Sequence, residues 1–206
     1  MFDLKVFSRL SLLGLLVLFT GCATVQSPDE RDPYESYNRA MYQFNDTVDR
    51  AVLKPVAKGY DVVVPDAISW GVSNFFSNLN DITVAINSLL QGKFSQAADD
   101  TGRFLLNSTV GVAGIFDVAG HAGNKKRNED FGQTLGAWGA EPGAYIVLPF
   151  FGPRTVRDSF GLVGDMFTDP VMYVEGPGAR NAFAGTRLVD TRANLLKSER
   201  VLDEAT

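Results

Sequence analysis

The sequence predicts a mostly α-helical protein, on three observations. Apolar residues recur at spacings of three and four along several segments, which is the period of one helix face. Helix-start residues and a glycine stop separate these segments by only a few residues, as in a compact array of helices. The stretch that most resembles a strand, residues 145–151, contains Pro149, which argues against a central position in a sheet.

The first helix is expected to begin near Asp32. This residue can cap the helix, Pro33 suits the first helical position, and Glu35 completes a capping box. The Lys54-Pro55 pair should end or kink the helix, because proline lacks the backbone N–H that a helix interior needs. Its apolar stripe comprises Tyr34, Tyr37, Met41, Phe44 and Val48.

Three more helices are expected before residue 110. The second covers residues 65–81, Asp81 opens a third over 81–92 with Gly92 as its stop, and the fourth covers 94–106. One face of the second helix is formed by Ile68, Val72, Phe75, Phe76 and Leu79. The residues of the fourth that should face inward are Ala97, Ala98, Thr101, Phe104 and Leu105.

The second half of the chain is richer in glycine. Residues 109–123 are either a short helix or a buried turn. Residues 129–153 hold five glycines, three prolines and five large aromatic residues, which predicts two short apolar arms joined by a Gly/Pro turn, as a loop or hairpin. A short helix over 155–169 and a long one over 178–205 follow. The candidate inward residues of the long helix are Phe183, Leu188, Leu195, Leu196 and Leu202.

A secretory signal is predicted at the N-terminus. Lys5 and Arg9 give this end positive charge, and a short apolar run over residues 10–19 leads to small residues. The run is shorter than the roughly 20 apolar residues that a bilayer crossing requires. The alternative is an N-terminal core helix, which the polar, Pro-containing stretch after the run disfavours.

The only cysteine, Cys22, directly follows this run. Residues 19–22, FTGC, resemble the lipobox of bacterial lipoproteins, in which the cysteine is diacylated and becomes the first mature residue. Several acyl chains give a stable anchor where one would be marginal. Ala23 stands where an aspartate would resemble an inner-membrane address, so the outer membrane is expected. The predicted parts are a signal at 1–21, a linker at 22–31 and one helical domain at 32–206.

Composition and motifs give little support to an enzyme or to a nucleic-acid-binding protein. Residues 22–206 carry 17 Lys and Arg against 23 Asp and Glu, so no basic stripe is present to meet phosphates. His121 is the only histidine, and no mature-chain cysteine other than Cys22 could complete a zinc site with it. No G-x-S-x-G elbow or Walker-type loop occurs. We therefore predict no catalytic residue, no metal and no cofactor beyond the covalent lipid on Cys22.

Eight segments, spread in order from residue 32 to residue 196, together resemble the MlaA (VacJ) family of outer-membrane lipoproteins. They are DPYESYNRAMYQFN (32–45), KPVA (54–57), VSNFFSNL (72–79), NSLLQGK (87–93), RFLLNSTVGVAGIFDVAG (103–120), FGQTLGAWG (131–139), YIVLPFFGPRTVRD (145–158) and TRANLL (191–196). Family members usually continue with a further aromatic- and Arg-containing segment, so the sequence leaves open whether Thr206 is the natural C-terminus.

The resemblance implies a ring-like array of amphipathic helices lying in the inner leaflet of the outer membrane, around a channel that is polar on one side and apolar on the other. Family members bind trimeric porins. They pass phospholipids that have strayed into the outer leaflet to a periplasmic carrier, MlaC, which keeps that leaflet rich in lipopolysaccharide. The alternatives are an envelope lipoprotein that only tethers or scaffolds other proteins, and a lipid hydrolase.

Site residues are assigned by their position in the matched motifs. Arg39 is expected to be either a channel or rim residue or a structural ion-pair partner. Segment 131–152 is expected to be a flexible gate beside the channel, and the alternative is a rigid surface hairpin. The candidate channel or rim residues are Asn38, Arg39, Phe44, Asn74 and Asn78. The candidate gate residues are Phe131, Gly132, Gly136, Gly139, Gly143, Pro149, Phe150, Phe151 and Gly152.

Overall fold

The computed structural model describes residues 32–204, and the side chains of residues 32–199. The predicted signal, Cys22, the linker and Leu202 as an inward side chain lie outside these residues. The protein is mostly helical, as predicted. Within residues 32–204, no helix combines the length and the apolar character that crossing a membrane requires.

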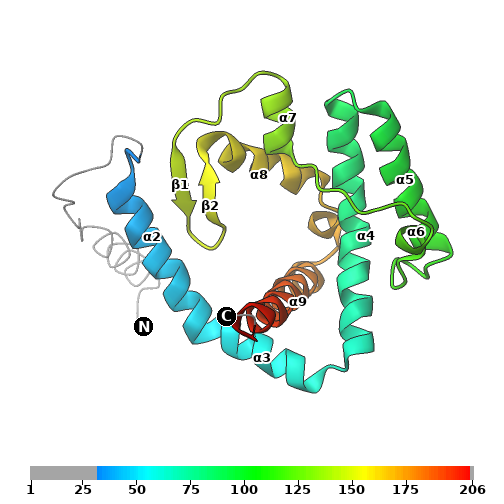
Figure 1. Ribbon diagram of the computed structural model, residues 1–206, viewed down its shortest axis with the longest axis horizontal. Helices are drawn as coiled ribbons and strands as arrows, with labels where there is room; N and C mark the ends of the chain where they lie inside the picture. Colours follow the sequence, from blue (N-terminus) through cyan, green and yellow to red (C-terminus); the bar gives the residue numbers. More distant parts are fainter. Residues whose placement is uncertain (1–31, 205–206) are drawn as a thin grey trace, which may run out of the picture.

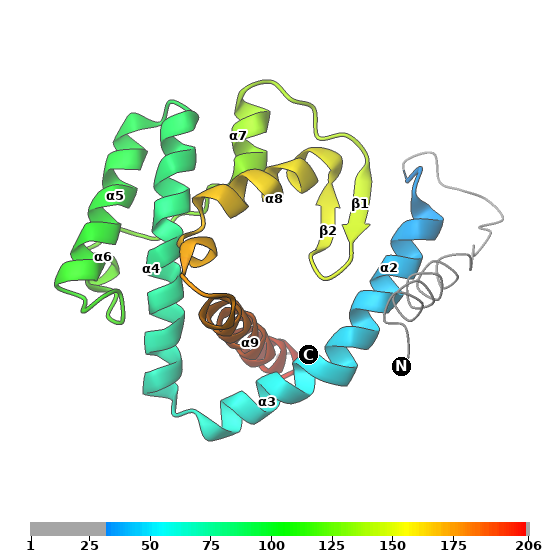
Figure 2. The ribbon, with the colours of Figure 1, turned by 180° about the vertical axis from the view of Figure 1, so that it is seen from behind.

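The helices are arranged as a ring (Figures 1 and 2). One side is formed by α2, η1 and α3, and α4 faces it across the ring. The α7–α8 pair and the β-hairpin form a third side, and α9 returns to pack against α3. The bounds are α2 Glu35–Val48, π-helix η1 Asp49–Leu53, α3 Lys54–Val63, α4 Asp66–Leu90, α5 Phe94–Thr109, α6 Val118–His121, α7 Phe131–Ala137, β1 Tyr145–Leu148, β2 Gly152–Thr155, α8 Val156–Thr168, 3-10 helix η2 Pro170–Tyr173 and α9 Pro177–Glu204.

The helical path kinks at Pro55 rather than ending there. The widened π turn of η1 lies between α2 and α3, and Pro55 falls in the first turn of α3, where proline is tolerated. Figure 1 shows that α2 and α3 run in different directions. Asp32 caps differently from the expected box: its carboxylate accepts hydrogen bonds from the Tyr34 N–H and the Asn38 amide, and α2 begins at Glu35.

The expected helices 65–81 and 81–92 are in fact one helix of 25 residues, α4. Asp81 does not start a helix, because its side chain is buried and pairs with Lys126 and Arg103 instead of capping backbone N–H groups. The predicted stop is confirmed: Gly92 follows the end of α4 with a φ of 74°, a conformation that favours glycine.

Helix α5 turns its polar side inward. Ala97 is buried as predicted and Phe104 is half-buried, but Leu105 is 54% exposed, and Ala98 and Thr101 are also exposed. The buried residues are Ala97, Asp100, Arg103 and Asn107. In α9, Leu196 is buried as predicted, whereas Phe183, Leu188 and Leu195 are exposed.

The polarity of the whole ring is inverted in the same way. Among the described side chains, 13 buried residues are polar or charged and 9 are apolar, while 30 large apolar residues are exposed. Water-soluble monomers rarely expose so much contiguous apolar surface. Hydrophobic patterning therefore predicts most of the helical segments but divides α4 into two helices and assigns several helix faces to the wrong side.

The Gly-rich half contains one helix more than predicted. Residues 110–116 form a turn and the short helix α6 follows, but the turn is mostly exposed rather than buried, with Val110, Val112 and Phe116 each more than half exposed. Asp130 caps the unexpected helix α7 by accepting the Gln133 N–H at 2.7 Å. The hairpin is confirmed, with β1 and β2 antiparallel and Leu148 opposite Gly152. The helices predicted over 155–169 and 178–205 correspond to α8 and α9.

Candidate functional site

Two cavities meet at the tip of the hairpin, which we define as residues 149–151. The larger, about 660 Å³, lies between α2, the hairpin and α9, and we call it the α2 cavity. The smaller, about 370 Å³, lies between α4, α8, η2 and α9, and we call it the α4 cavity. Phe151 lines both. Phe151 is therefore the residue that the two linings share.

The α2 cavity is lined by both polar and apolar residues. Its polar residues come from α2, η1 and α9, and are Asn45, Asp46, Asp49, Arg192, Ser198 and Glu199. Its apolar residues are Tyr42, Leu53, Val147, Phe150, Phe151, Pro153 and Leu195. Such a lining can accept a molecule with a charged end and an oily end without leaving either in the wrong medium.

Two asparagines of α2 hold the hairpin, and we call them the asparagine pair. Asn38 donates to the Tyr145 carbonyl at 3.2 Å and accepts the Val147 N–H at 2.8 Å. Asn45 donates to the Leu148 carbonyl at 2.9 Å and accepts the Phe150 N–H at 2.7 Å. The two residues are seven apart, so they lie on one helix face. Each side-chain amide thus satisfies backbone groups as a neighbouring strand would.

The tip held by Asn45 is strained. Phe150 has a φ of 67°, a conformation that costs a bulky side chain roughly 1–2 kcal/mol. Its ring is 72% exposed and meets Phe44 edge-on at 5.2 Å between ring centroids. Phe44 and Phe150 were both predicted as site residues, and the structure brings them together. Asn45 was missed, although its spacing from Asn38 was a usable signal.

The glycines of segment 131–152 have two different roles. In α7, a Cβ on Gly132 would lie 2.6 Å from an oxygen of Asp158, and one on Gly136 would lie 2.7 Å from a nitrogen of Arg157. These glycines permit close packing of α7 against α8. Gly139, Gly143 and Gly152 instead have positive φ values of 95°, 69° and 75° and form turns. Phe131 packs on Trp138 with ring centroids 5.8 Å apart.

The ring is closed by ion pairs between α9 and the π turn. The Arg192 guanidinium contacts both oxygens of Asp49, at 2.7 and 2.8 Å, and also Glu199 at 2.9 Å. The hydrogen bond from Arg192 lowers the pKa of Asp49, and the same bond raises the pKa of Arg192. A small apolar core of Ala57, Ala193 and Leu196 lies beside this joint, between α3 and α9.

The other predicted rim residues lie elsewhere. Asn74 donates to the Ile115 carbonyl at 3.0 Å and the buried Asn78 to the Ser108 hydroxyl at 2.9 Å, so both hold the 108–116 region against α4. Neither lines the α2 cavity or the α4 cavity. Arg39 forms an ion pair with Glu35 one turn before it, at 2.7 Å.

The described residues contain no group of three or more His, Cys, Asp or Glu side chains placed to hold a metal ion. His121 lies on α6, exposed, with Nδ1 2.7 Å from the Asp117 carbonyl oxygen. A carbonyl only accepts, so this nitrogen carries the proton. The arrangement suits transient enclosure of an amphipathic molecule.

Comparisons with known proteins agree with this geometry. A family model described as MlaA lipoprotein matches residues 30–206. The intermembrane phospholipid transport system lipoprotein MlaA of Escherichia coli is 36% identical over 204 residues, which cover 96% of this chain and 81% of the relative. The protein of the same name from Haemophilus influenzae is 35% identical over 211 residues, which cover 98% of this chain and 84% of the relative's length.

The fold is also shared with a solved structure from work on the structural basis for maintenance of bacterial outer membrane lipid asymmetry. That structure aligns with a TM-score of 0.71 and 34% identity, covering 85% of this chain and 89% of the solved chain. On the extent of these matches, the chain belongs to the MlaA lipoprotein family.

Proposed function

We propose that this protein removes mislocalised phospholipids from the outer leaflet of the outer membrane and passes them through the ring to a periplasmic carrier. The observation that carries the proposal is the distribution of polarity in the ring, in which 30 large apolar side chains are exposed while most of the buried side chains are polar or charged. In water such a surface would drive aggregation, whereas among acyl chains it is stable. The names of the relatives point to the same process.

The α2 cavity supplies the physical means. Moving a polar headgroup through hydrocarbon without hydrogen bonds costs several kcal/mol. Exposing an acyl chain to water costs about 0.8 kcal/mol for each CH₂ group. A passage with a polar and an apolar wall lowers both costs together, so lipid moves down its own gradient without ATP at this site.

The hairpin tip is the proposed gate of this passage. Phe151 borders both cavities, and the backbone N–H of the strained Phe150 is held by the Asn45 side chain. Release of that side chain would let the tip swing and join the cavities. A disulfide between N45C and F150C should stop lipid clearance until it is reduced. Unchanged clearance in the oxidised double variant would favour a rigid surface hairpin.

The anchor and the partners complete the proposal. Lipidated Cys22 would hold the ring at the inner leaflet of the outer membrane, and trimeric porins would fix its position there. A carrier of the MlaC type would receive the lipid on the periplasmic side. In this scheme the protein performs no bond-breaking chemistry, and phospholipid is its transported ligand.

The decisive experiment is purification of the acylated protein from outer membranes in mild detergent. We expect bound phospholipid and a porin trimer to co-purify, and loss of the protein to raise outer-leaflet phospholipid and detergent sensitivity. A tethering protein would leave lipid asymmetry intact when lost. A hydrolase would release fatty acid from added phospholipid.

A further inference from the structure

Arg154 is a cation on the inner side of the ring whose charge acts on Asp158 and Asp165 without a direct bond to either. In the part of the chain whose side chains are described, its guanidinium makes neither an ion pair nor a hydrogen bond, and its Nε is buried with no acceptor. The other arginines near the cavities are paired: Arg187 contacts Asp169 at 2.6 Å and Arg192 contacts Asp49 at 2.7 Å. A half-buried unpaired charge is costly unless a counter-charge arrives.

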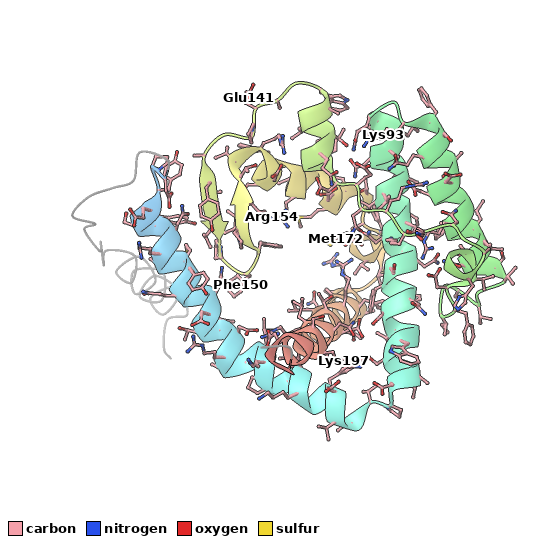
Figure 3. All side chains as sticks on the ribbon, viewed as in Figure 1. Lys93, Glu141, Phe150, Arg154, Met172 and Lys197 are labelled. Atoms are coloured by element: carbon pink, nitrogen blue, oxygen red, sulfur yellow. The ribbon has the colours of Figure 1, made fainter. Side chains whose placement is uncertain are left out.

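The register of the hairpin sets the direction of this side chain. Arg154 lies opposite Ile146, while its neighbour Pro153 lies opposite Val147. Since Val147 and Pro153 line the α2 cavity, Arg154 and Ile146 face away from it, because alternate residues of a strand point to opposite faces. Arg154 lines neither cavity, but Figure 3 shows it on the inner side of the ring, beneath α8, and its charge acts on Asp165, which lines the α4 cavity.

The carboxylates of this region are already bonded to other groups. Burial raises the pKa of Asp165, and the charge of Arg154 acts in the opposite direction. Asp165 nevertheless accepts the Phe131 N–H at 2.9 Å and the Asn87 amide at 3.2 Å, and receives no hydrogen bond from Arg154. The Asp158 carboxylate accepts a hydrogen bond from the Arg157 Nε at 2.9 Å. The fork of Arg154 therefore stays available to an anion.

We infer that Arg154 binds the phosphate of a glycerophospholipid as it passes Phe151, pairing its guanidinium with the phosphodiester oxygens. This inference rests on the proposed function and names the chemical group that the passage recognises. Arginine suits the role because its planar fork matches two phosphate oxygens. A passage also needs a contact that forms readily and is released again, which a single half-exposed pair provides.

The test measures lipid binding to the full acylated protein in detergent micelles. The probes are phosphatidylglycerol and a diacylglycerol with the same chains, which lacks phosphate. R154Q should lose about tenfold in affinity for phosphatidylglycerol, as expected for one charged hydrogen-bonded contact, and keep its affinity for diacylglycerol. R154K should fall between R154Q and the wild type. R180Q is the matched control and should bind both lipids as the wild type does.

Three results would overturn the inference. One is unchanged phosphatidylglycerol binding in R154Q. Another is an equal loss for both lipids, which would assign Arg154 a packing role; circular dichroism of R154K and R154Q checks that the fold is kept. The third is an Arg154-dependent binding of inorganic phosphate that does not compete with phosphatidylglycerol. If the wild type binds neither lipid, the proposed function itself fails, a pattern distinct from the other three.

Discussion

Two parts of the ring are held in opposite ways. The wall made by α4, α5 and α6 is joined by buried charges, whereas the hairpin is joined to α2 by the uncharged asparagine pair. Buried ion pairs are costly to break. The bonds of Asn38 are buried or half-buried, whereas the bond from the Phe150 N–H to Asn45 at the tip is exposed and costs less to open. The difference indicates a fixed wall and a hairpin tip that can move.

The charges of the wall form one cluster, which we call the charge cluster. Asp81 pairs with Lys126 and with Arg103, and Arg103 also contacts Asp117 at 2.7 Å. Burial raises the pKa of Asp81 and lowers the pKa of Lys126, and the contact between the two opposes both shifts. Arg127 joins Asp100 to the same cluster at 3.1 Å. Like charges also oppose each other in the cluster, since Asp100 raises the pKa of Asp81 and Arg103 lowers the pKa of Lys126, so its members are coupled.

The largest expected effect is the loss of Asp81. The variant D81N leaves Arg103 and Lys126 buried beside a neutral amide, which should lower the free energy of unfolding by about 3–5 kcal/mol. Thermal unfolding in detergent, followed by circular dichroism, measures the change. The matched control is D99N, which removes the same charge from a carboxylate that is 51% exposed and paired with Arg127. The control should change stability by less than about 1 kcal/mol. Equal losses of stability in D81N and D99N would mean that the buried carboxylate contributes no more to the wall than the exposed one.

The sequence singles out Asp81 as a helix start but does not predict the charge cluster. Asp81 follows Asn80 in a polar stretch, and a polar residue before an apolar run normally indicates a helix start. Its partner Lys126 lies 45 positions later, and only the tertiary fold brings the two together. The helices themselves were predictable, because an apolar stripe has the same period whichever medium it faces.

The side to which each apolar stripe faces was not predictable, because the period of a stripe is the same whichever medium it contacts. Leu105 and Leu195 have the spacing of core residues, yet they are 54% and 53% exposed. A pattern of apolar and polar residues does not show whether an apolar face packs inside the protein or contacts lipid. Asn45 and Arg192 were missed because their roles depend on partners more than 100 positions away.

The next largest effect concerns the joint between the π turn η1 and α9. D49N should lower stability by about 2 kcal/mol at neutral pH, since it removes the charged partner of Arg192. Because the folded pKa of Asp49 lies below its unfolded value, its contribution is present above the unfolded pKa of about 3.9 and is lost as pH falls through the folded pKa. D49N and the wild type should therefore converge in acid. A constant difference in stability down to pH 2 would contradict this assignment.

A smaller effect separates the two regions directly. N45A removes the side chain that bonds both Leu148 and Phe150, and should cost about 1 kcal/mol, confined to the tip. Hydrogen exchange of the Phe150 N–H should then accelerate about fivefold, as that free energy implies. The matched control N74A removes one bond to Ile115 on the wall and should leave the tip unchanged. Faster exchange along the whole of α2 in N45A would mean that tip and helix move together.

The smallest effect isolates the strain at Phe150. F150A removes the ring but keeps a side chain at a φ of 67°, whereas F150G removes both the ring and the strain. Each variant loses the contact with Phe44, so the difference between them reports the backbone alone. F150G should be the more stable of the two by about 1 kcal/mol, because glycine adopts positive φ without a steric cost. Thermal unfolding of the pair, measured side by side in the same detergent, gives that difference. Equal stability would place the tip in a relaxed conformation, and Asn45 would then fix its position without holding it against strain.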